Sequence, residues 1–228
     1  MIFVLLAIIA GVIFLPQWWV KRVMERYHRP ADRYPGTGAE LARHLLDRLG
    51  LDQVRVERID ELGDHYDPSE RVVRLSPANH DGRSLTAVTV AAHEVGHAVQ
   101  HADGYAPLIW RTRMVEVLTR WQRIGVLMIA LMPVAMLALR LPRAGLILLI
   151  MGVASLASGI IVHLVTLPTE FDASFRRALP LLTKGDYLKP GDRRHARRIL
   201  TAAALTYVAA SLIGLVNFWW WLRILRPG

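Results

Sequence analysis

A glutamate between two histidines is the group of side chains best suited to chemistry. The five residues from His93 to His97 form an H-E-x-x-H pattern. Ser84 can cap the start of a helix through this stretch, and Gly104 can end it. Four residues make just over one helical turn, so both imidazoles lie on one face and can bind a single zinc ion. Glu94 lies within reach of a zinc-bound water as general base, which is the arrangement of a metalloprotease.

The simpler interpretation of this motif is a chance pattern in a helix built only for packing. The surroundings of the motif argue against it. An unpaired Glu94 is costly in a helix otherwise rich in alanine, valine and glycine. Gly96 weakens the helix by about 1 kcal/mol relative to alanine. A packing helix gains nothing from either residue, so the motif favours a metal site.

A catalytic zinc ion needs a third protein ligand, and three residues compete for that role. The chain has no cysteine, so the ligand must offer nitrogen or oxygen. His101 lies one turn beyond the motif, and its ring would have to bend back to reach the ion. Asp103 stands where some families place a ligand, but those families break the helix with a glycine at the position of Gln100. Glu170 is the distant candidate, two residues after Pro168, which suits the first turn of a new helix.

Long apolar runs flanked by basic residues predict a multi-pass membrane protein. The chain has 228 residues, is 53% hydrophobic and carries a net charge of +9. Because the positive charges flank the apolar runs, we expect a lipid bilayer and no nucleic acid as partner. Tryptophans and Lys21 close the first run, which indicates an uncleaved anchor rather than a signal peptide. The four runs are residues 1–20, 124–139, 144–167 and 200–222.

These runs divide the chain into five segments. The third run carries small residues that suit close helix packing, namely Gly152, Ser155, Ser158 and Gly159. Only four residues separate the second and third runs, so we expect a tight hairpin. The segments are an anchor at 1–20, a cytoplasmic H-E-x-x-H metallopeptidase region at 21–123, a transmembrane hairpin at 124–167, a cytoplasmic segment at 168–199 that supplies the third zinc ligand, and a transmembrane helix with a short tail at 200–228.

The distribution of lysine and arginine predicts the orientation in the inner membrane. Residues 21–123 carry 16 of these cations and residues 168–199 carry 8, whereas the hairpin loop and the C-terminal tail carry 2 each. The positive-inside rule therefore places both larger polar segments, and the active site, in the cytoplasm. Two crossings separate Glu170 from His97, so the charge pattern returns Glu170 to the side of the histidines independently of the motif.

The region before the motif predicts several short elements. In order, they are a basic and aromatic segment at the membrane surface (21–35), a helix (39–49) opened by Gly36-Thr37-Gly38 and capped by Gly50, a strand (54–59), a turn (64–68) and a second strand (71–76). In many zinc peptidases an edge strand holds the substrate by main-chain pairing. The strand at 71–76 is the candidate for that role, with an ordinary structural strand as the alternative.

Five stretches in this order resemble the YugP-like membrane zinc metallopeptidases, a family broadly similar to HtpX-like membrane proteases. They are DHYDP at 64–68, VRLS at 73–76, VAAHEVGHA at 90–98, TLPTEFDAS at 166–174 and AALTYVAA at 203–210. The resemblance covers nearly the whole chain. It implies zinc bound by His93, His97 and Glu170, with Glu94 as the catalytic base. The expected fold is mainly α with a small β-sheet, in which about four transmembrane helices carry a gluzincin-like metallopeptidase domain.

The expected function is a membrane-embedded, zinc-dependent endopeptidase. Glu94 takes a proton from the attacking water and passes it to the leaving amine. The substrate is a polypeptide at or near the bilayer. One alternative is a non-catalytic zinc-binding membrane scaffold, which needs a fourth ligand that the sequence does not show. A second is a lipid-surface-binding protein, which leaves Glu94 and Glu170 unexplained.

The residues that assist the reaction stay open at this point. In better-known glutamate-zinc peptidases an acidic residue four positions after the ligand glutamate holds a zinc histidine. Ser174 stands at that position here, and Asp172, two positions after Glu170, is expected to point elsewhere on a helix. Both stay possible supporting residues of the site. His163 is either a buried, hydrogen-bonded residue or a neighbour of the site. Candidate donors to the developing oxyanion are Tyr207, His195, His65 and Tyr66.

Overall fold

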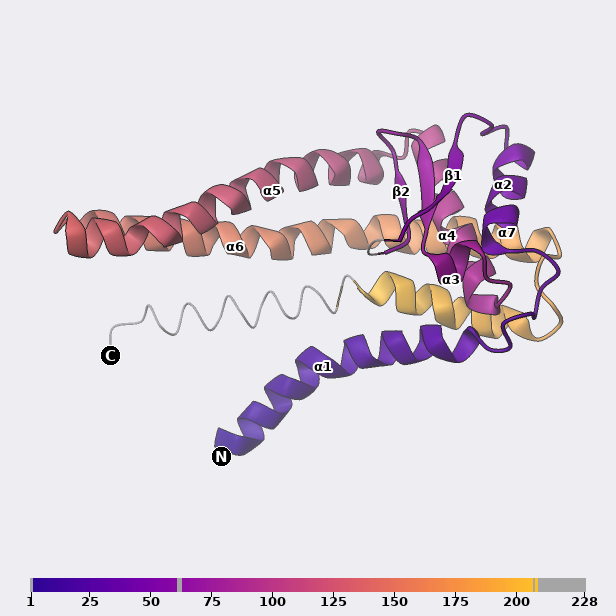
Figure 1. Ribbon diagram of the computed structural model, residues 1–228, viewed down its shortest axis with the longest axis horizontal. Helices are drawn as coiled ribbons and strands as arrows, with labels where there is room; N and C mark the ends of the chain where they lie inside the picture. Colours follow the sequence, from indigo (N-terminus) through magenta and orange to yellow (C-terminus); the bar gives the residue numbers. More distant parts are fainter. Residues whose placement is uncertain (1, 61–62, 207, 209–228) are drawn as a thin grey trace. The chain divides into compact units, whose positions relative to one another are not determined.

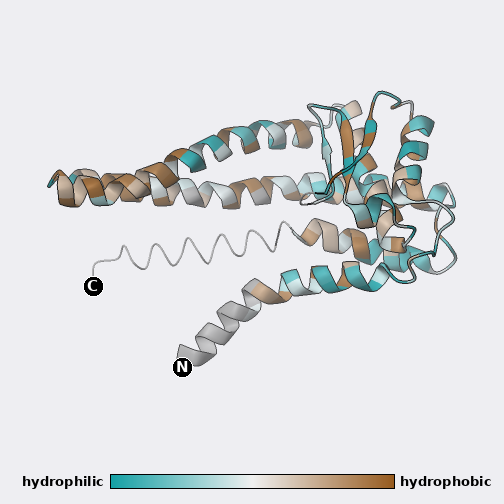
Figure 2. Ribbon diagram, in the orientation of Figure 1, coloured by the Kyte–Doolittle hydropathy of each residue, from teal (hydrophilic) through white to brown (hydrophobic). Residues whose placement is uncertain are grey.

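The computed structural model describes residues 2–60, 63–206 and 208. Helices predominate, and three short strands form one sheet (Figure 1). This composition confirms the mainly helical fold with a small sheet. Apolar residues are concentrated along the two longest helices (Figure 2).

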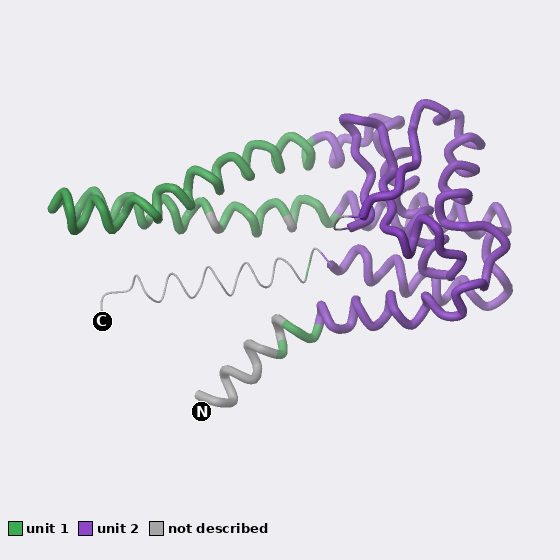
Figure 3. Tube along the Cα trace, in the orientation of Figure 1, with its two compact units in different colours: residues 1–15, 110–167, 207–228 green, residues 16–109, 168–206 purple. Residues whose placement is uncertain are grey.

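The chain divides into two compact units (Figure 3). Unit 1 comprises residues 1–15, 110–167 and 207–228, and unit 2 comprises residues 16–109 and 168–206. The H-E-x-x-H motif and Glu170 therefore fall in the same unit, although 72 residues of sequence that include the predicted hairpin separate His97 from the carboxylate.

Two long helices form most of the described part of unit 1. α5 (Ala106–Pro133) continues as the π-helical turn η1 (Val134–Ala138), and α6 (Pro142–Phe171) follows after a tight turn. The helical segments 106–138 and 142–184 are long and apolar enough to cross a membrane, by length and composition. The two helices form the helical hairpin that was predicted, and that it crosses a membrane stays a prediction. Its first helix begins well before residue 124.

Small residues bring the helices of the hairpin together. A Cβ atom added to Gly125 would lie 1.5 Å from Ser155 Oγ, and one added to Gly152 would lie 2.4 Å from Ile129 Cγ1. The close packing predicted for the small residues of the third run is confirmed. Large apolar side chains cover much of the outer surface of these helices, among them Leu137 at 79% exposure. Such a surface suits lipid better than water.

The first and fourth apolar runs are described only in part. α1 (Ile2–Tyr27) covers the first run and continues as a single helix through its basic end. Residues 192–206 are also helical. Most of the fourth run, with Tyr207, lies outside the described residues, so the number of spans and the domain boundaries stay predictions.

α4 (Leu85–Ala102) carries the H-E-x-x-H motif and is buried along most of its length. Ser84 caps it as predicted, because its Oγ accepts a hydrogen bond from the Ala87 N–H at 3.1 Å. Gly104 follows the helix with a φ of 63°, which a glycine adopts without strain. Fully buried alanines on α4 leave room for neighbouring helices. This helix therefore holds the motif on a rigid, tightly packed element.

The sheet has the strand order β1-β3-β2. β1 (Arg55–Arg58) pairs in parallel with β3 (Val72–Leu75), and β2 (His65–Asp67) pairs with β3 in antiparallel fashion. The turn predicted at 64–68 is therefore wrong, since its middle residues form an edge strand. The role predicted for the strand at 71–76 is also wrong. β3 is the central strand, and neighbours already occupy both of its edges, so a substrate cannot pair with it.

Hydrogen bonds hold the polar segments around α4 in place. α2 (Gly38–Arg48) begins with a capping box in which Thr37 and Glu40 bond to each other's backbone N–H groups. The short helix α3 (Pro77–His80) follows β3. Asp64 Oδ1 accepts from the Ser76 N–H at 2.7 Å, and its Oδ2 accepts from Asn79 Nδ2 at the same distance. The carboxylate of Asp64 thus anchors the start of β2 to the end of β3.

The basic and aromatic segment at 21–35 contributes to the core of unit 2. Tyr27 and Tyr34 are both buried there. The Tyr34 hydroxyl donates to Asp192 Oδ2 at 2.6 Å, and Arg33 donates to both oxygens of the same carboxylate. Burial and the bond to Asp192 raise the pKa of Tyr34. Burial alone would raise the pKa of Asp192, but the hydrogen bonds from Arg33 and Tyr34 outweigh it and lower this pKa. These contacts join the segment to the C-terminal helix.

The helix that carries Glu170 changes character just after it. Pro168 was expected to open a new helix, but it lies inside α6. The π-helix η2 (Asp172–Ala178) and then α7 (Leu179–Lys184) follow without a break. Proline removes one backbone donor and crowds the preceding turn, and a π-helical segment accommodates such a disturbance. In η2 both Asp172 and Ser174 are buried.

Candidate metal centre

Three buried side chains converge between α4 and the end of α6. His93 Nε2 lies 3.2 Å from Glu170 Oε2, and His97 Nε2 lies 3.5 Å from the same oxygen. The two imidazole rings stand 4.8 Å apart at 78°. The three ligand atoms lie within 4.8 Å of one another, so this group could hold a metal ion. The structure thus brings to the histidines the most distant of the three candidate third ligands.

Gly96 allows the two helices to approach closely enough for this arrangement. A Cβ atom at Gly96 would lie 2.8 Å from the carbonyl oxygen of Ala173, a distance that real Cβ contacts do not show. Any larger residue would therefore push η2 away from α4. Since Glu170 directly precedes η2, this close crossing fixes its distance from the histidines.

Gln100 determines which nitrogen of His97 faces the centre. Its amide nitrogen donates to the carbonyl oxygen of Thr169 and to Asp172 Oδ2, both at 2.8 Å. Both of these partners only accept, so the amide oxygen must be the atom 2.9 Å from His97 Nδ1. That nitrogen therefore carries a proton, and the lone pair of the neutral ring lies on Nε2.

Ser174 determines which nitrogen of His93 faces the centre. Its hydroxyl lies 3.2 Å from His93 Nδ1 and 3.5 Å from the carbonyl oxygen of Leu200. The carbonyl can only accept, so the hydroxyl donates to it and accepts from the imidazole. The lone pair of His93 then lies on Nε2 as well. Ser174 thus stands where better-known glutamate-zinc enzymes place an acidic residue, and it contacts a histidine of the cluster.

The hydrogen-bond pattern fits a bound cation at this centre. With both Nδ1 atoms protonated, two Nε2 lone pairs and a carboxylate oxygen face one another with no hydrogen between them. Three acceptors at such distances repel unless a cation lies among them. Two imidazole nitrogens and one carboxylate oxygen are a common donor set for catalytic zinc. Hydrogen bonds to the far nitrogens of the imidazoles are also typical of zinc sites.

A partly buried ion pair between Asp172 and Arg177 supports Gln100 on the side away from His97. Asp172 Oδ2 accepts from Gln100 Nε2 and from Arg177 Nε, each at 2.8 Å. Arg177 also pairs with Asp103 at 2.5 Å. Asp103, one of the candidate third ligands, therefore binds an arginine. The chain of contacts from Arg177 through Asp172 and Gln100 ends at His97, so it orients that ring.

Gln100 was not predicted as a functional residue. In the sequence it stands out only as the position where some families have a helix-breaking glycine. A usable signal was its spacing, because a residue three positions after His97 lies on the same helical face. Asp172 was one of the possible supporting residues, but its contact with Gln100 could not be predicted because the π-helical geometry of η2 is not visible in the sequence.

The other candidates, at the end of α4 and in the sheet, have neighbours of their own. The Tyr66 hydroxyl lies 2.8 Å from His101 Nδ1. Burial raises the pKa of Tyr66 to about 12, so this hydroxyl stays protonated at neutral pH. His65 Nδ1 lies 3.0 Å from the carbonyl oxygen of Gly63. His101, the nearest candidate third ligand in sequence, is thus held by a tyrosine.

The candidates late in the chain are placed only in part. His195 lies 3.6 Å from Asp192 and packs its ring 5.0 Å from that of Tyr27. Tyr207 lies outside the described residues, as does the side chain of His163. Glu94 is 5% exposed and directly follows His93 on α4. The donor to the oxyanion therefore stays a prediction among Tyr207, His195, His65 and Tyr66.

Two histidines one turn apart on a buried helix, with a glutamate from a distant helix, define a centre of the kind that zinc metallopeptidases use. Residues 2–226 match the family described as "Putative neutral zinc metallopeptidase", and the chain belongs to this family. It is 39% identical over 217 residues to "Putative membrane protease YugP" of Bacillus subtilis (strain 168), an alignment that covers 94% of this chain and 92% of the relative. No solved structure matches the chain. The resemblance seen in the five sequence stretches is confirmed.

Proposed function

We propose that this chain is a zinc-dependent endopeptidase whose metal is held by His93, His97 and Glu170. The observation that carries the proposal is the convergence of their three acceptor atoms within 4.8 Å in the core of unit 2. Membership of a family described as zinc metallopeptidases supports the choice of metal and of reaction. The donor set leaves one position of a tetrahedral ion for water or substrate.

Glu94 is the group that moves protons in this reaction. Zinc, when bound, supplies a Lewis acid that polarises the peptide carbonyl and lowers the pKa of water to about 7. The carboxylate of Glu94 takes the proton of the attacking water and returns it to the leaving nitrogen. Gln100 and Ser174 keep the two imidazoles in the tautomer that presents Nε2. The low exposure of the three ligands limits competing contacts with solvent.

A structural zinc site in a non-catalytic scaffold is the main rival. A structural site is closed by four protein ligands. The group found in the described part of the chain offers three. This count favours catalysis, as does a second buried carboxylate, Glu94, next to a ligand. A lipid-surface-binding protein would need neither buried carboxylate.

Hydrolysis of an unfolded protein by purified wild type and Glu94→Gln tests the proposal. We expect the variant to lose at least about 100-fold in rate, since a positioned general base contributes roughly that much or more. Its zinc content, measured in the same preparation, should equal that of the wild type. A His101→Gln control should retain activity. Equal rates for wild type and Glu94→Gln would end the peptidase proposal.

We further propose that the site faces the cytoplasm from the inner membrane and acts on polypeptides at or near the bilayer. Support comes from two apolar helices, from the charge distribution and from a relative named as a membrane protease. A topology reporter inserted between Arg140 and Arg143 should be found outside the cytoplasm. A cytoplasmic reporter at that position would contradict this orientation.

A further inference from the structure

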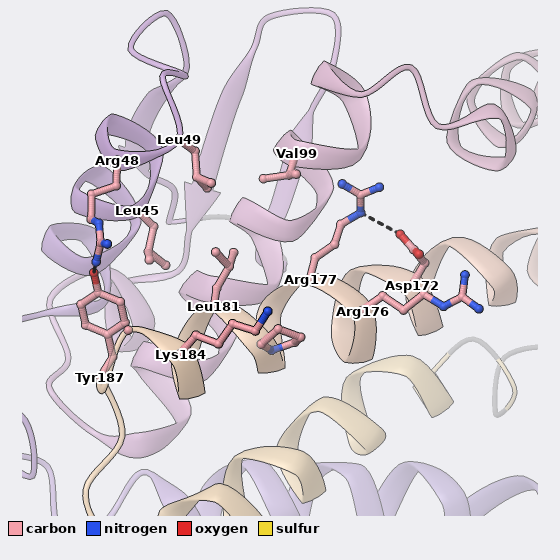
Figure 4. A pocket seen from close by; sticks show the side chains of 12 residues that line it. Leu45, Arg48, Leu49, Val99, Asp172, Arg176, Arg177, Leu181, Lys184 and Tyr187 are labelled. Atoms are coloured by element: carbon pink, nitrogen blue, oxygen red, sulfur yellow. Dashed lines mark hydrogen bonds and ion pairs between the residues drawn. The ribbon is translucent and has the colours of Figure 1, made fainter.

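A cavity that is separate from the metal centre lies on unit 2, beside the elements that hold the zinc ligands. Its volume is about 540 Å³, and residues of α2, α4, η2, α7 and the turn that follows line it (Figure 4). None of the three proposed zinc ligands belongs to its lining. The volume falls in the range of sites for small molecules.

Positive charge dominates the lining. Four cations, Arg48, Arg176, Arg177 and Lys184, surround the cavity, and Asp172 is the only anion among the residues that line it. Two of the cations already have partners. Arg177 pairs with Asp172, and Arg48 donates to the Tyr187 hydroxyl at 2.8 Å.

The other two cations are available to a ligand. Within the described part of the chain, the side chains of Arg176 and Lys184 have neither a hydrogen-bond acceptor nor an ion-pair partner, although acidic groups pair with many other arginines of unit 2. Figure 4 shows the charged ends of these two side chains apart from each other, with the guanidinium of Arg176 directed away from Lys184. A bound anion is stabilised by a charge-assisted contact with either cation. An anionic group therefore fits beside Lys184, where Arg176 and Arg177 add positive charge to the lining.

The remainder of the cavity is apolar. Leu45, Leu49 and Val99 lie along one side, and Leu181 lies opposite them next to Lys184 (Figure 4). Leu49 is 39% exposed although it belongs to an otherwise well-packed unit. Covering these side chains with an apolar group is favourable in free energy, because it removes apolar surface from water. A simple inorganic anion would leave this half of the cavity unused.

We propose that this cavity is a second ligand site, which takes a small organic anion with a short apolar body. The carboxylate or phosphate head lies against Lys184, in the positive charge to which Arg176 and Arg177 contribute, and the body lies against the leucines and Val99. Asp172 links the two sites, because it lines the cavity and also accepts from Gln100, which holds His97. A ligand in this cavity can contact Asp172, and Asp172 in turn contacts Gln100, which orients His97.

Calorimetric titration of the purified full-length protein tests the chemistry of the ligand. We expect 4-phenylbutyrate and phenyl phosphate to bind, and their relative affinities distinguish a carboxylate from a phosphate head. Inorganic phosphate and 4-phenylbutylamine should bind at least ten-fold more weakly. Binding of the amine as tight as that of the carboxylate would overturn the proposal. So would inorganic phosphate that binds as tightly as phenyl phosphate.

Substitutions locate the binding. The double variant Arg176→Gln, Lys184→Met should weaken 4-phenylbutyrate at least ten-fold, whereas Lys21→Met, which removes a lysine with a 77% exposed side chain elsewhere in unit 2, should not change it. Leu49→Glu should block the site with its own carboxylate, and the isosteric Leu49→Gln should retain binding. Wild-type affinity in both the double variant and Leu49→Glu would place the ligand elsewhere and refute the site.

Discussion

Gln100 links the chemistry of the metal centre to the packing of unit 2. It is fully buried, and all three of its hydrogen bonds have a direction fixed by the partner. Because its amide hydrogens are used by Thr169 and Asp172, its oxygen can only accept from His97. The neutral tautomer of that imidazole is therefore set by a side chain that never touches the metal. Ser174 provides a weaker version of the same constraint on His93, at 3.2 Å.

Replacing Gln100 with leucine should weaken zinc binding by about 10- to 100-fold, the usual effect of losing a group that orients a metal-bound histidine. The substitution removes the acceptor for His97 Nδ1 and keeps a side chain of similar volume. Competition with a chelating dye measures the affinity. Gln53→Leu, at an exposed position, is the matched control and should bind zinc as the wild type does. Equal affinities for the two variants would show that Gln100 does not orient His97.

At the scale of single residues, the sequence predicts those residues whose spacing along the chain indicates a metal site. His93, Glu94 and His97 follow from one helical turn, and Glu170 follows from charge counting together with the family resemblance. Gln100 could not be assigned, because its role depends on acceptors contributed by a helix 69 residues and more away. Asp172 could be named only as a possible supporting residue, since its contact with Gln100 depends on how η2 packs against α4.

At the scale of elements, the crossing of α4 and η2 determines the site. Gly96 and Ala173 form the point of closest approach, and Glu170 lies just before it. Caps and periodicity predicted α4 and α2 well, because those signals are local. They failed at β2 and Pro168, where tertiary contacts decide. Asp64 anchors residues 64–68, whose composition is typical of a turn, to the end of β3. At Pro168, packing keeps α6 helical beyond the proline.

Gly96→Ala should lower the free energy of unfolding by about 1–3 kcal/mol, the usual cost of overpacking. Alanine favours a helix by about 1 kcal/mol, so a net loss must come from the clash with the Ala173 carbonyl. Zinc affinity should fall too, because η2 shifts and takes Glu170 with it. Gly11→Ala is the control, since its new Cβ would meet only Leu15 at 3.6 Å. Denaturant unfolding that shows the Gly96 variant as stable as the control would contradict a tight crossing.

At the scale of the whole molecule, two distant parts of the chain build one unit. Unit 2 joins residues 16–109 with residues 168–206, and the apolar hairpin lies between them in sequence. The sequence predicted this meeting, because an even number of crossings returns the chain to the side where it started. It could not predict how the terminal segments join, since that depends on buried pairs such as Arg33 with Asp192. The number of spans stays a prediction.

The most direct test of the account is the amount of zinc bound per chain in the wild type, Glu170→Ala and Asp103→Ala. All three proteins should be purified in parallel and dialysed against the same weak chelator. We predict one zinc ion per chain in the wild type and in Asp103→Ala, and little or none in Glu170→Ala. A Glu170→Ala protein that keeps a full equivalent of zinc, or an Asp103→Ala protein that loses it, would contradict the proposed centre.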